Sequence, residues 1–144
     1  DDLLVGGAGA DVLEGGDGID TASYAGSAQS VSVDLTTGVG SGGDAAGDAL
    51  SGIENLIGSG HDDSLVGNAD ANVLRGEKGE DVLSGGVVGS VLCISDGHDT
   101  ASYAGSSAGV SINLRTGAAS GGDAAGDQLV SVESLIGSSF DDAL

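Results

Sequence analysis

The chain has no proline, methionine or tryptophan, and among its 144 residues are only one phenylalanine, two tyrosines and one cysteine. With so few large aromatic and thioether side chains, it cannot fill a conventional globular core. The single cysteine, Cys93, excludes an internal disulfide. The chain also lacks an apolar run long enough to span a membrane and a stretch that resembles a signal peptide.

Positive charge is scarce as well. Three Lys and Arg residues stand against 23 Asp and Glu, which gives a formal net charge of −20. Nucleic acids and anionic membranes would be repelled by such a chain, so they are excluded as partners of this segment. Its natural partners are cations. Arg75, Lys78 and Arg115 are better interpreted as isolated surface charges than as a clamp for a substrate.

Glycine is abundant, with 29 residues, and much of it follows a pattern. Residues 6–23 form two consecutive nine-residue units of the form G-G-x-G-x-D-x-U-x, where U is a large apolar residue. The glycines permit a tight turn that brings backbone carbonyl oxygens together. The aspartate adds an anionic oxygen, and the x-U-x that follows predicts a short strand whose apolar side chain points inward.

A short loop that offers carbonyl and carboxylate oxygens together is half of a calcium site, because Ca²⁺ takes roughly 6 to 8 oxygen ligands. A disordered acidic linker would not keep Leu and Asp in fixed positions nine residues apart. On this motif the chain resembles the RTX ("repeats in toxin") family of calcium-binding proteins. The resemblance implies an all-β fold, a right-handed parallel β-roll or β-helix solenoid with several calcium ions in its turns.

The nine-residue spacing occurs in three blocks, which begin at Asp1, Gly58 and Gly137. The acidic position of the unit holds Asp2, Asp11, Asp20, Asp63, Asn72, Asp81, Ser90, Asp99 and Asp142. The apolar position holds Leu4, Leu13, Leu65, Leu74, Leu83, Leu92 and Leu144. Residues 87–95 depart from the motif and lack its paired glycines and its aspartate, which weakens the case for calcium beside them.

In the β-roll that the resemblance implies, two units make one turn, so loops eighteen residues apart stack on the same side. Asp2 and Asp20 have this spacing, and Asp63, Asp81 and Asp99 would form a three-step ladder. We therefore expect calcium mainly along the three-step ladder.

The opposite side of the roll is expected to be poorer in carboxylates, because Asn72 and Ser90 lie there and Asp11 would face Gln29. The acidic residues expected to bind calcium are Asp2, Asp11, Asp20, Asp63, Asp81, Asp99 and Asp142. The glycines expected to bring carbonyl oxygens to these sites are Gly6, Gly7, Gly9, Gly15, Gly18, Gly76, Gly79 and Gly97.

A longer repeat contains the short one. The segment DTASYAGS, which begins at Asp20, recurs from Asp99 onward, and three further segments recur at the same displacement along the chain. We interpret residues 1–144 as a single repeat domain and expect it to be a fragment of a larger protein. It divides into a first long repeat (1–65), a spacer within the roll (66–79) and a second long repeat (80–144).

The segments between the blocks predict further strands. Apolar and polar residues alternate over residues 31–35 and 110–114. Residues 48–57 fit either a helix or short strands, and Gly52 favours the strands. The segment GGDAAGD occurs twice and places Asp44 four residues before Asp48, and Asp123 four residues before Asp127. It is compatible with an additional calcium loop and equally with a solvated turn.

Other chemistries find little support. A zinc site needs three or four converging His or Cys ligands, whereas His61, Cys93 and His98 are scattered. No motif places a Ser, His and Asp set for nucleophilic catalysis. The dinucleotide fingerprint and the EF-hand loop are both absent from the sequence. We expect no enzymatic activity.

Stacked carboxylates about 5 Å apart would repel by roughly 3 kcal/mol per pair at an effective dielectric near 20. Several such pairs rival the stability of a small domain, about 5 to 15 kcal/mol. We therefore expect the chain to be largely unfolded without metal and to fold when it binds calcium outside the cell.

The resemblance implies a secreted bacterial protein that leaves the cell through a one-step (type I) exporter. This segment would support secretion and stability of covalently linked flanking domains, such as those of a toxin. The alternative is a structural or adhesive spacer, stiffened by calcium, in a large surface protein.

Overall fold

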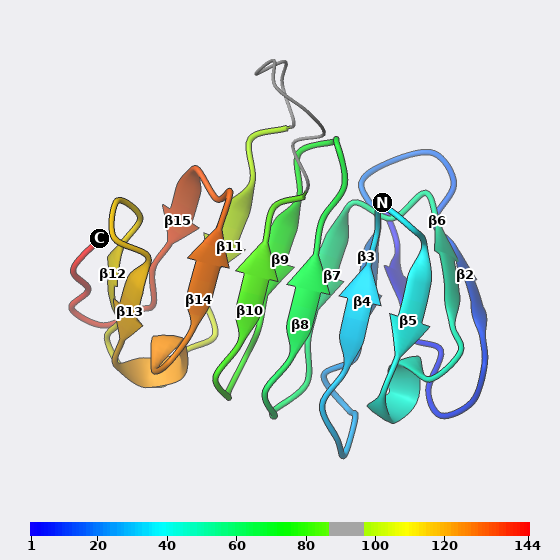
Figure 1. The fold of residues 1–144 in the computed structure, drawn as a ribbon, viewed down its shortest axis with the longest axis horizontal. Helices are drawn as coiled ribbons and strands as arrows, with labels where there is room; N and C mark the ends of the chain where they lie inside the picture. The colour runs from blue at the N-terminus through cyan, green and yellow to red at the C-terminus, as the bar shows by residue number, and fades with distance from the viewer. Residues whose placement is uncertain (87–96) are drawn as a thin grey trace.

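Short β-strands and single-turn 3-10 helices make up the regular structure of the chain (Figure 1). The computed structural model describes residues 1–86 and 97–144. Each strand has only two or three residues, and most strands follow a glycine-containing loop. The all-β fold expected from the sequence is confirmed for these residues.

Two sheets run along the molecule. The first contains, in spatial order, β1 (Leu3–Leu4), β3 (Thr21–Ser23), β7 (Asn55–Ile57), β9 (Val73–Arg75), β11 (Thr100–Ser102) and β15 (Ser134–Ile136). The second contains β14 (Gln128–Val130), β10 (Val82–Ser84), β8 (Ser64–Val66), β4 (Ser32–Asp34), β5 (Val39–Ser41), β6 (Ala49–Ser51) and β2 (Val12–Glu14). From β7 to β10 the chain alternates between the two sheets at every strand.

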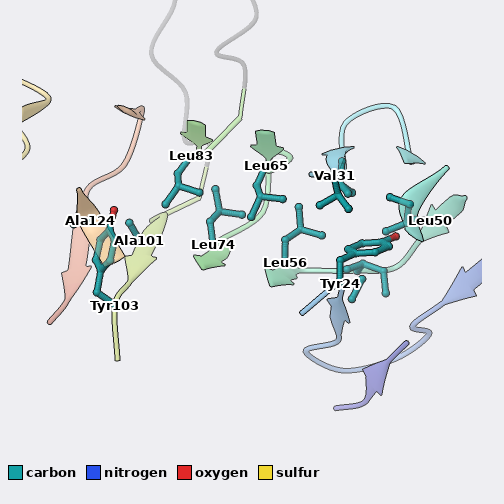
Figure 2. Packing of buried hydrophobic residues seen from close by; sticks show 14 of the residues in the cluster. Tyr24, Val31, Leu50, Leu56, Leu65, Leu74, Leu83, Ala101, Tyr103 and Ala124 are labelled. Carbon is teal, nitrogen blue, oxygen red and sulfur yellow. The ribbon is translucent and has the colours of Figure 1, made fainter. Parts of the chain in front are cut away.

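The apolar position of the nine-residue unit forms the core, as the sequence predicted. The central residue of each strand points inward, so that Leu56 pairs with Leu74 in the first sheet and Leu65 with Leu83 in the second. All four leucines are completely buried. Figure 2 shows the leucines of the two sheets pointing toward one another across a thin interior. Leucines alone therefore build most of this part of the core.

The segments between the blocks add antiparallel pairs, which the sequence did not predict. Strand β5 pairs antiparallel with β4 and β6, and β12 (Ser111–Asn113) pairs antiparallel with β13 (Ala118–Ser120). The strands expected within residues 31–35 and 110–114 are confirmed as β4 and β12. Residues 48–57 form β6 and β7, which confirms strands over a helix. Each GGDAAGD segment contains a 3-10 turn, η1 (Gly43–Ala45) or η2 (Gly122–Ala124).

Within the second block of nine-residue units, the register departs from the expected eighteen-residue step between β9 and β11. Strand β11 pairs with β9 in parallel, with Ala101 beside Leu74, so three nine-residue units separate these two strands where two were expected. The predicted placements of Ser90 and Leu92, within the departing unit 87–95, lie outside the described residues. The strand pairing alone shows that Asp99 precedes a strand of the first sheet, whereas the sequence placed it in line with Asp81.

Within the described ranges, no helix is long and apolar enough to cross a membrane.

Truncation of Leu74 tests the leucine core. Leu74 is completely buried, and Leu to Ala at such sites costs about 2 to 5 kcal/mol because it leaves a cavity. The neighbouring Val73 is 36% exposed, so Val73→Ala is a matched control with a smaller expected cost. Urea unfolding in the presence of calcium measures both. Equal losses for the two variants would contradict the packing described above.

Substitution of Glu77 tests backbone strain in a loop. Glu77 has φ 72°, in a loop position that Gly7 (φ 83°) and Gly16 (φ 90°) fill elsewhere. An L-residue pays about 1 to 2 kcal/mol for this conformation. The ion pair of Glu77 with Arg75 is partly exposed, so it stabilises the folded chain by less than the backbone strain costs. We expect Glu77→Gly to stabilise the folded chain by up to about 1 kcal/mol, after the entropy that glycine adds to the unfolded state.

The control for this substitution is Glu80→Gly, because Glu80 is exposed and has no positive φ. This change should cost about 0.5 to 1 kcal/mol in the same unfolding experiment. The same loss for both variants would show that Glu77 carries no strain.

Candidate metal centre

In most nine-residue units that the structure describes, the acidic position lies directly before a strand. Asp11 precedes β2, Asp20 precedes β3, Asp63 precedes β8 and Asp81 precedes β10. The backbone N–H of each of these four residues donates to a carboxylate oxygen of an acidic residue in a neighbouring coil. The acidic residues therefore form rows along the molecule, one beside each sheet.

The row beside the second sheet consists of Asp63, Asp81 and Asp127, and we call it the Asp81 row. The N–H of Asp63 donates to Oδ1 of Asp81 at 2.9 Å, and the N–H of Asp81 donates to Oδ1 of Asp127 at 3.0 Å. The same contact recurs near the N-terminus, where the N–H of Asp11 donates to Oδ1 of Asp48 at 2.9 Å. Each carboxylate thereby fixes the position of the coil beside it.

The row beside the first sheet, the Asp20 row, consists of Asp2, Asp20, Glu54, Asn72, Asp99 and Glu133. The N–H of Asp2 donates to Oδ1 of Asp20 at 2.6 Å, and the N–H of Asp20 donates to Oε2 of Glu54 at 2.8 Å. In the same way, the N–H of Asn72 donates to Oδ1 of Asp99 at 2.9 Å, and the N–H of Asp99 donates to Oε2 of Glu133 at 3.0 Å. The amide of Asn72 also donates to the carbonyl oxygen of Glu54 at 2.7 Å.

The predicted ladders are right in part. The steps from Asp2 to Asp20 and from Asp63 to Asp81 have the expected spacing of eighteen residues. The step from Asp81 to Asp99 is wrong, because β11 pairs with β9 and thereby brings Asp99 beside Asn72.

The prediction that Asp11 would face Gln29 is also wrong, since Asp11 contacts Asp48. Asp48 directly precedes β6, and β6 pairs with β2, so the segment that contains β4, β5 and β6 brings Asp48 beside Asp11. Asp48 and Asp127 are both buried, so a solvated turn does not describe the second aspartate of GGDAAGD.

Sequence reasoning missed Glu54 and Glu133. They follow Asp20 and Asp99 by 34 residues each, so they are equivalent in the two long repeats. Their equivalent positions in the two long repeats could have identified them from the sequence.

The tyrosines were a second omission. The hydroxyl of Tyr24 donates to Oδ2 of Asp48 at 3.0 Å, and that of Tyr103 donates to Oδ2 of Asp127 at 2.8 Å. Both hydrogen bonds are buried, and burial is the main cause that raises the pKa of each tyrosine. Asp48 and Asp127 therefore use both carboxylate oxygens within the protein.

The first glycine of the unit packs against the carboxylate five residues later. A Cβ added to Gly6 would lie 2.9 Å from Oδ2 of Asp11, and one added to Gly15 would lie 2.8 Å from Oδ2 of Asp20. A Cβ added to Gly76 would collide with Oδ2 of Asp81. Only glycine allows this close approach. Of the other predicted loop glycines, those with positive φ are Gly7, Gly9, Gly18 and Gly79. Gly97 packs against the backbone of Ala71, in the adjacent loop.

The carboxylate oxygens beside these glycines lack partners. Within residues 1–86 and 97–144, Oδ2 of Asp11, Asp20 and Asp81 is buried and accepts no hydrogen bond. A buried polar atom without a partner costs about 1 to 3 kcal/mol, and more when it is charged. Hard anionic oxygens in a glycine loop match the ligands that Ca²⁺ prefers, so these residues fit a calcium ion.

Side chains alone do not complete such a site. No group of three or more His, Cys, Asp and Glu residues lies close enough to hold a metal in the described part of the chain. An ion at these loops would take one or two carboxylates from each row and its remaining oxygens from backbone carbonyls or water. A calcium ion at these loops would therefore take many of its ligands from the loop backbone.

Burial and neighbouring charge destabilise the ionised Asp81 row. Burial raises the pKa of Asp81 to about 7, against the opposing hydrogen bond from the N–H of Asp63, and the charge of Asp127 adds to the rise. Burial also raises the pKa of Asp127. By contrast, the N–H of Val110 and then the Ser138 hydroxyl lower the pKa of Asp142. The ionised form is therefore disfavoured at the centre of the Asp81 row and favoured at Asp142.

A comparison with protein families agrees with this chemistry. A family model described as "RTX calcium-binding nonapeptide repeat (4 copies)" matches residues 1–22 and 57–87. The matched ranges contain Asp11, Asp20 and Asp81, the residues whose buried oxygens lack partners. A search of curated proteins found no match. These two segments are similar to the calcium-binding nonapeptide repeats that this family model describes.

Proposed function

We propose that this chain is a calcium-dependent folding module without catalytic activity. The observation that carries the proposal is the set of buried carboxylate oxygens of Asp11, Asp20 and Asp81 that accept no hydrogen bond in the described residues. The finer architecture belongs to the same proposal. The alternation of strands between two sheets and the eighteen-residue contacts support a right-handed parallel β-roll with calcium in its turns.

The rows of acidic residues make folding conditional on cations. Within each row one carboxylate oxygen accepts the N–H of the next coil, so the same contacts that join the coils also bring negative charges together. Calcium, when bound, supplies the positive charge that offsets this repulsion. The leucine core is thin, and each buried leucine contributes only roughly 1.5 to 3 kcal/mol. The free energy of unfolding is therefore small compared with the repulsion between carboxylates that no cation screens.

We propose that the module works outside a bacterial cell, as part of a larger secreted protein. Extracellular calcium modules commonly bind in the range of about 0.1 to 1 mM, so folding would follow export from a low-calcium cytoplasm. The module would then support secretion and stability of flanking domains. The net charge of −20 supports calcium as the partner and disfavours nucleic acid.

A second candidate is a stiff spacer in a large surface protein. The parallel pairs β7 with β9 and β9 with β11 connect the first long repeat through the spacer to the second in one sheet, and the pair of β8 with β10 does so in the other. Such continuity favours a rigid rod over two separately moving units. Small-angle scattering with calcium on chains that carry the long repeat in additional copies tests the rod, whose length should increase by a constant step with each copy.

A calcium titration tests the proposed function. Chelated chain should show a largely disordered circular dichroism spectrum, and the β signal should appear cooperatively as calcium is added. Magnesium at the same concentration is the matched control, because its smaller octahedral site suits these loops poorly. A chelated sample with the complete β signal would contradict the proposal.

Asp81→Asn tests the row itself. An asparagine can keep the Oδ1 that accepts the N–H of Asp63, while it replaces the partnerless Oδ2 by a neutral amide group. With calcium we expect at least about tenfold weaker binding of one ion, since a charged ligand is lost. In chelator we expect no loss of structure, because a buried charge is removed.

The control for Asp81→Asn is Asp17→Asn, which removes the same charge from an exposed residue outside the acidic positions. Isothermal titration and circular dichroism measure the two variants. If both weaken calcium binding equally, net charge decides the affinity and the row does not.

A further inference from the structure

Residues 52–54 lie outside the two ranges that the family model matches, yet they contact a neighbouring coil as a nine-residue unit does. The regular contact is seen where the loop after Gly58 stacks on the loop after Gly76. The N–H of Gly58 donates to the carbonyl oxygen of Arg75 at 2.8 Å. A Cβ added to Gly58 would collide with Oδ2 of Asp63 and would lie 2.9 Å from the carbonyl oxygen of Gly76. This regular junction therefore places a carboxylate oxygen of one loop beside a carbonyl oxygen of the next.

The loop after Gly15 makes the same junction with residues 52–54. The N–H of Gly15 donates to the carbonyl oxygen of Ser51 at 3.0 Å. A Cβ added to Gly15 would collide with the carbonyl oxygen of Gly52 and would lie 2.8 Å from Oδ2 of Asp20. Gly52 therefore takes the place of the first glycine of a loop, although no nine-residue unit begins there.

Glu54 takes the acidic position of this short loop. It directly precedes β7, and its Oε2 accepts the N–H of Asp20 at 2.8 Å. In the regular junction Oδ1 of Asp81 accepts the N–H of Asp63 in the same way. The acidic residue of a regular unit follows the first glycine by five positions, whereas Glu54 follows Gly52 by two. The additional methylene of glutamate lengthens the side chain where the backbone loop is shorter, so three residues take the place of six.

The second long repeat contains the same short loop at residues 131–133. A Cβ added to Gly85 would collide with the carbonyl oxygen of Ser131 and with Oδ2 of Asp99. The N–H of Asp99 donates to Oε2 of Glu133 at 3.0 Å. The arrangement therefore belongs to the long repeat and is not confined to one place in the chain.

The two short loops also share a backbone turn. Gly52 has φ 60° and Ser131 has φ 51°. Serine rarely adopts this left-handed conformation. The carbonyl oxygen beside the neighbouring loop is therefore present in both repeats although the side chain differs.

At the junction in the first repeat, two hydrogen-bond acceptors lie side by side. Oδ1 of Asp20 accepts the N–H of Asp2 at 2.6 Å, but Oδ2, which lies beside the carbonyl group of Gly52, accepts no hydrogen bond within residues 1–86 and 97–144. Asp20 is completely buried. Carboxylate and carbonyl oxygens both carry negative charge, and a hard cation is the partner that suits both. Glu54 brings a second carboxylate to the same junction.

We propose that residues 52–54 and the loop after Gly15 together bind a calcium ion, at a site that the nine-residue repeat alone does not form. The ligands that the chain offers there are Oδ2 of Asp20, the carbonyl oxygen of Gly52 and the carboxylate of Glu54. Backbone carbonyls or water complete the coordination. The proposal rests on the proposed function, because it assigns the same ion to a segment that interrupts the repeat. Calcium binding thereby continues through this segment instead of ending before it.

Glu54→Gln tests the site. Glutamine keeps an oxygen that can accept the N–H of Asp20, and it removes the charge that a calcium ligand supplies. The matched control is Glu14→Gln, which makes the same change at an exposed residue outside the acidic positions. Isothermal titration with calcium measures the number of bound ions and their affinities, and circular dichroism of the same samples measures folding.

The expected loss is confined to one ion. Glu54→Gln should bind that ion at least about tenfold more weakly than the unaltered chain does, since a charged ligand is lost. At saturating calcium it should reach the same β signal, because the hydrogen bond to Asp20 is kept. Glu14→Gln should titrate like the unaltered chain. Equal titrations for the two variants would overturn the proposal.

Anomalous diffraction from crystals of the unaltered chain grown with calcium locates the ion without depending on the folding of a variant. We expect an ion bound by Oδ2 of Asp20 and the carbonyl oxygen of Gly52. Calcium at the regular loops with none at this junction would overturn the proposal and leave the calcium-folding function intact. Absence of any calcium-induced β signal in the unaltered chain would instead overturn the proposed function.

Discussion

The hydrogen bond from a backbone N–H to the carboxylate in a neighbouring coil is the interaction on which the structure depends. It joins Asp63 to Asp81 and Asp2 to Asp20, and it sets the spacing at which the strands beside them pair. Within the described ranges, the same bond leaves the other carboxylate oxygen of Asp20 and Asp81 in the interior without a partner. The same carboxylates therefore hold neighbouring coils together and bring negative charges close to one another.

The short repeat made much of the fold predictable. A leucine nine residues from the next can face a common interior only if successive strands alternate between two sheets, and Leu56, Leu65, Leu74 and Leu83 do so. The antiparallel pairs around β5 were not predictable in this way, because strand alternation in residues 31–35 fixes which side chains point inward but leaves the pairing partner open.

The contacts of the acidic residues were predictable where the two residues lie in successive turns of the short repeat. They were unpredictable where a longer segment outside the repeat separates the two residues. Asp63 and Asp81 are neighbours because a single turn separates them. The partner of Asp11 is Asp48, which a hairpin and a 3-10 turn return to the edge of β2. The position of Asp99 depends on one departing unit, since constant spacing assigns it to Asp81 and strand pairing assigns it to Asn72. A constant repeat spacing cannot predict such a shift of register.

Asn72 has a consequence for the charge of the Asp20 row. Its amide donates to the carbonyl oxygen of Glu54 while its own N–H donates to Asp99, so this position satisfies its polar groups with protein atoms. It directly precedes β9, whose Leu74 pairs with Leu56 on one side and Ala101 on the other. At this neutral position the neighbouring coils meet without two facing carboxylates. The middle of the chain is therefore the part of the Asp20 row where neighbouring coils pack without like-charge repulsion between acidic positions.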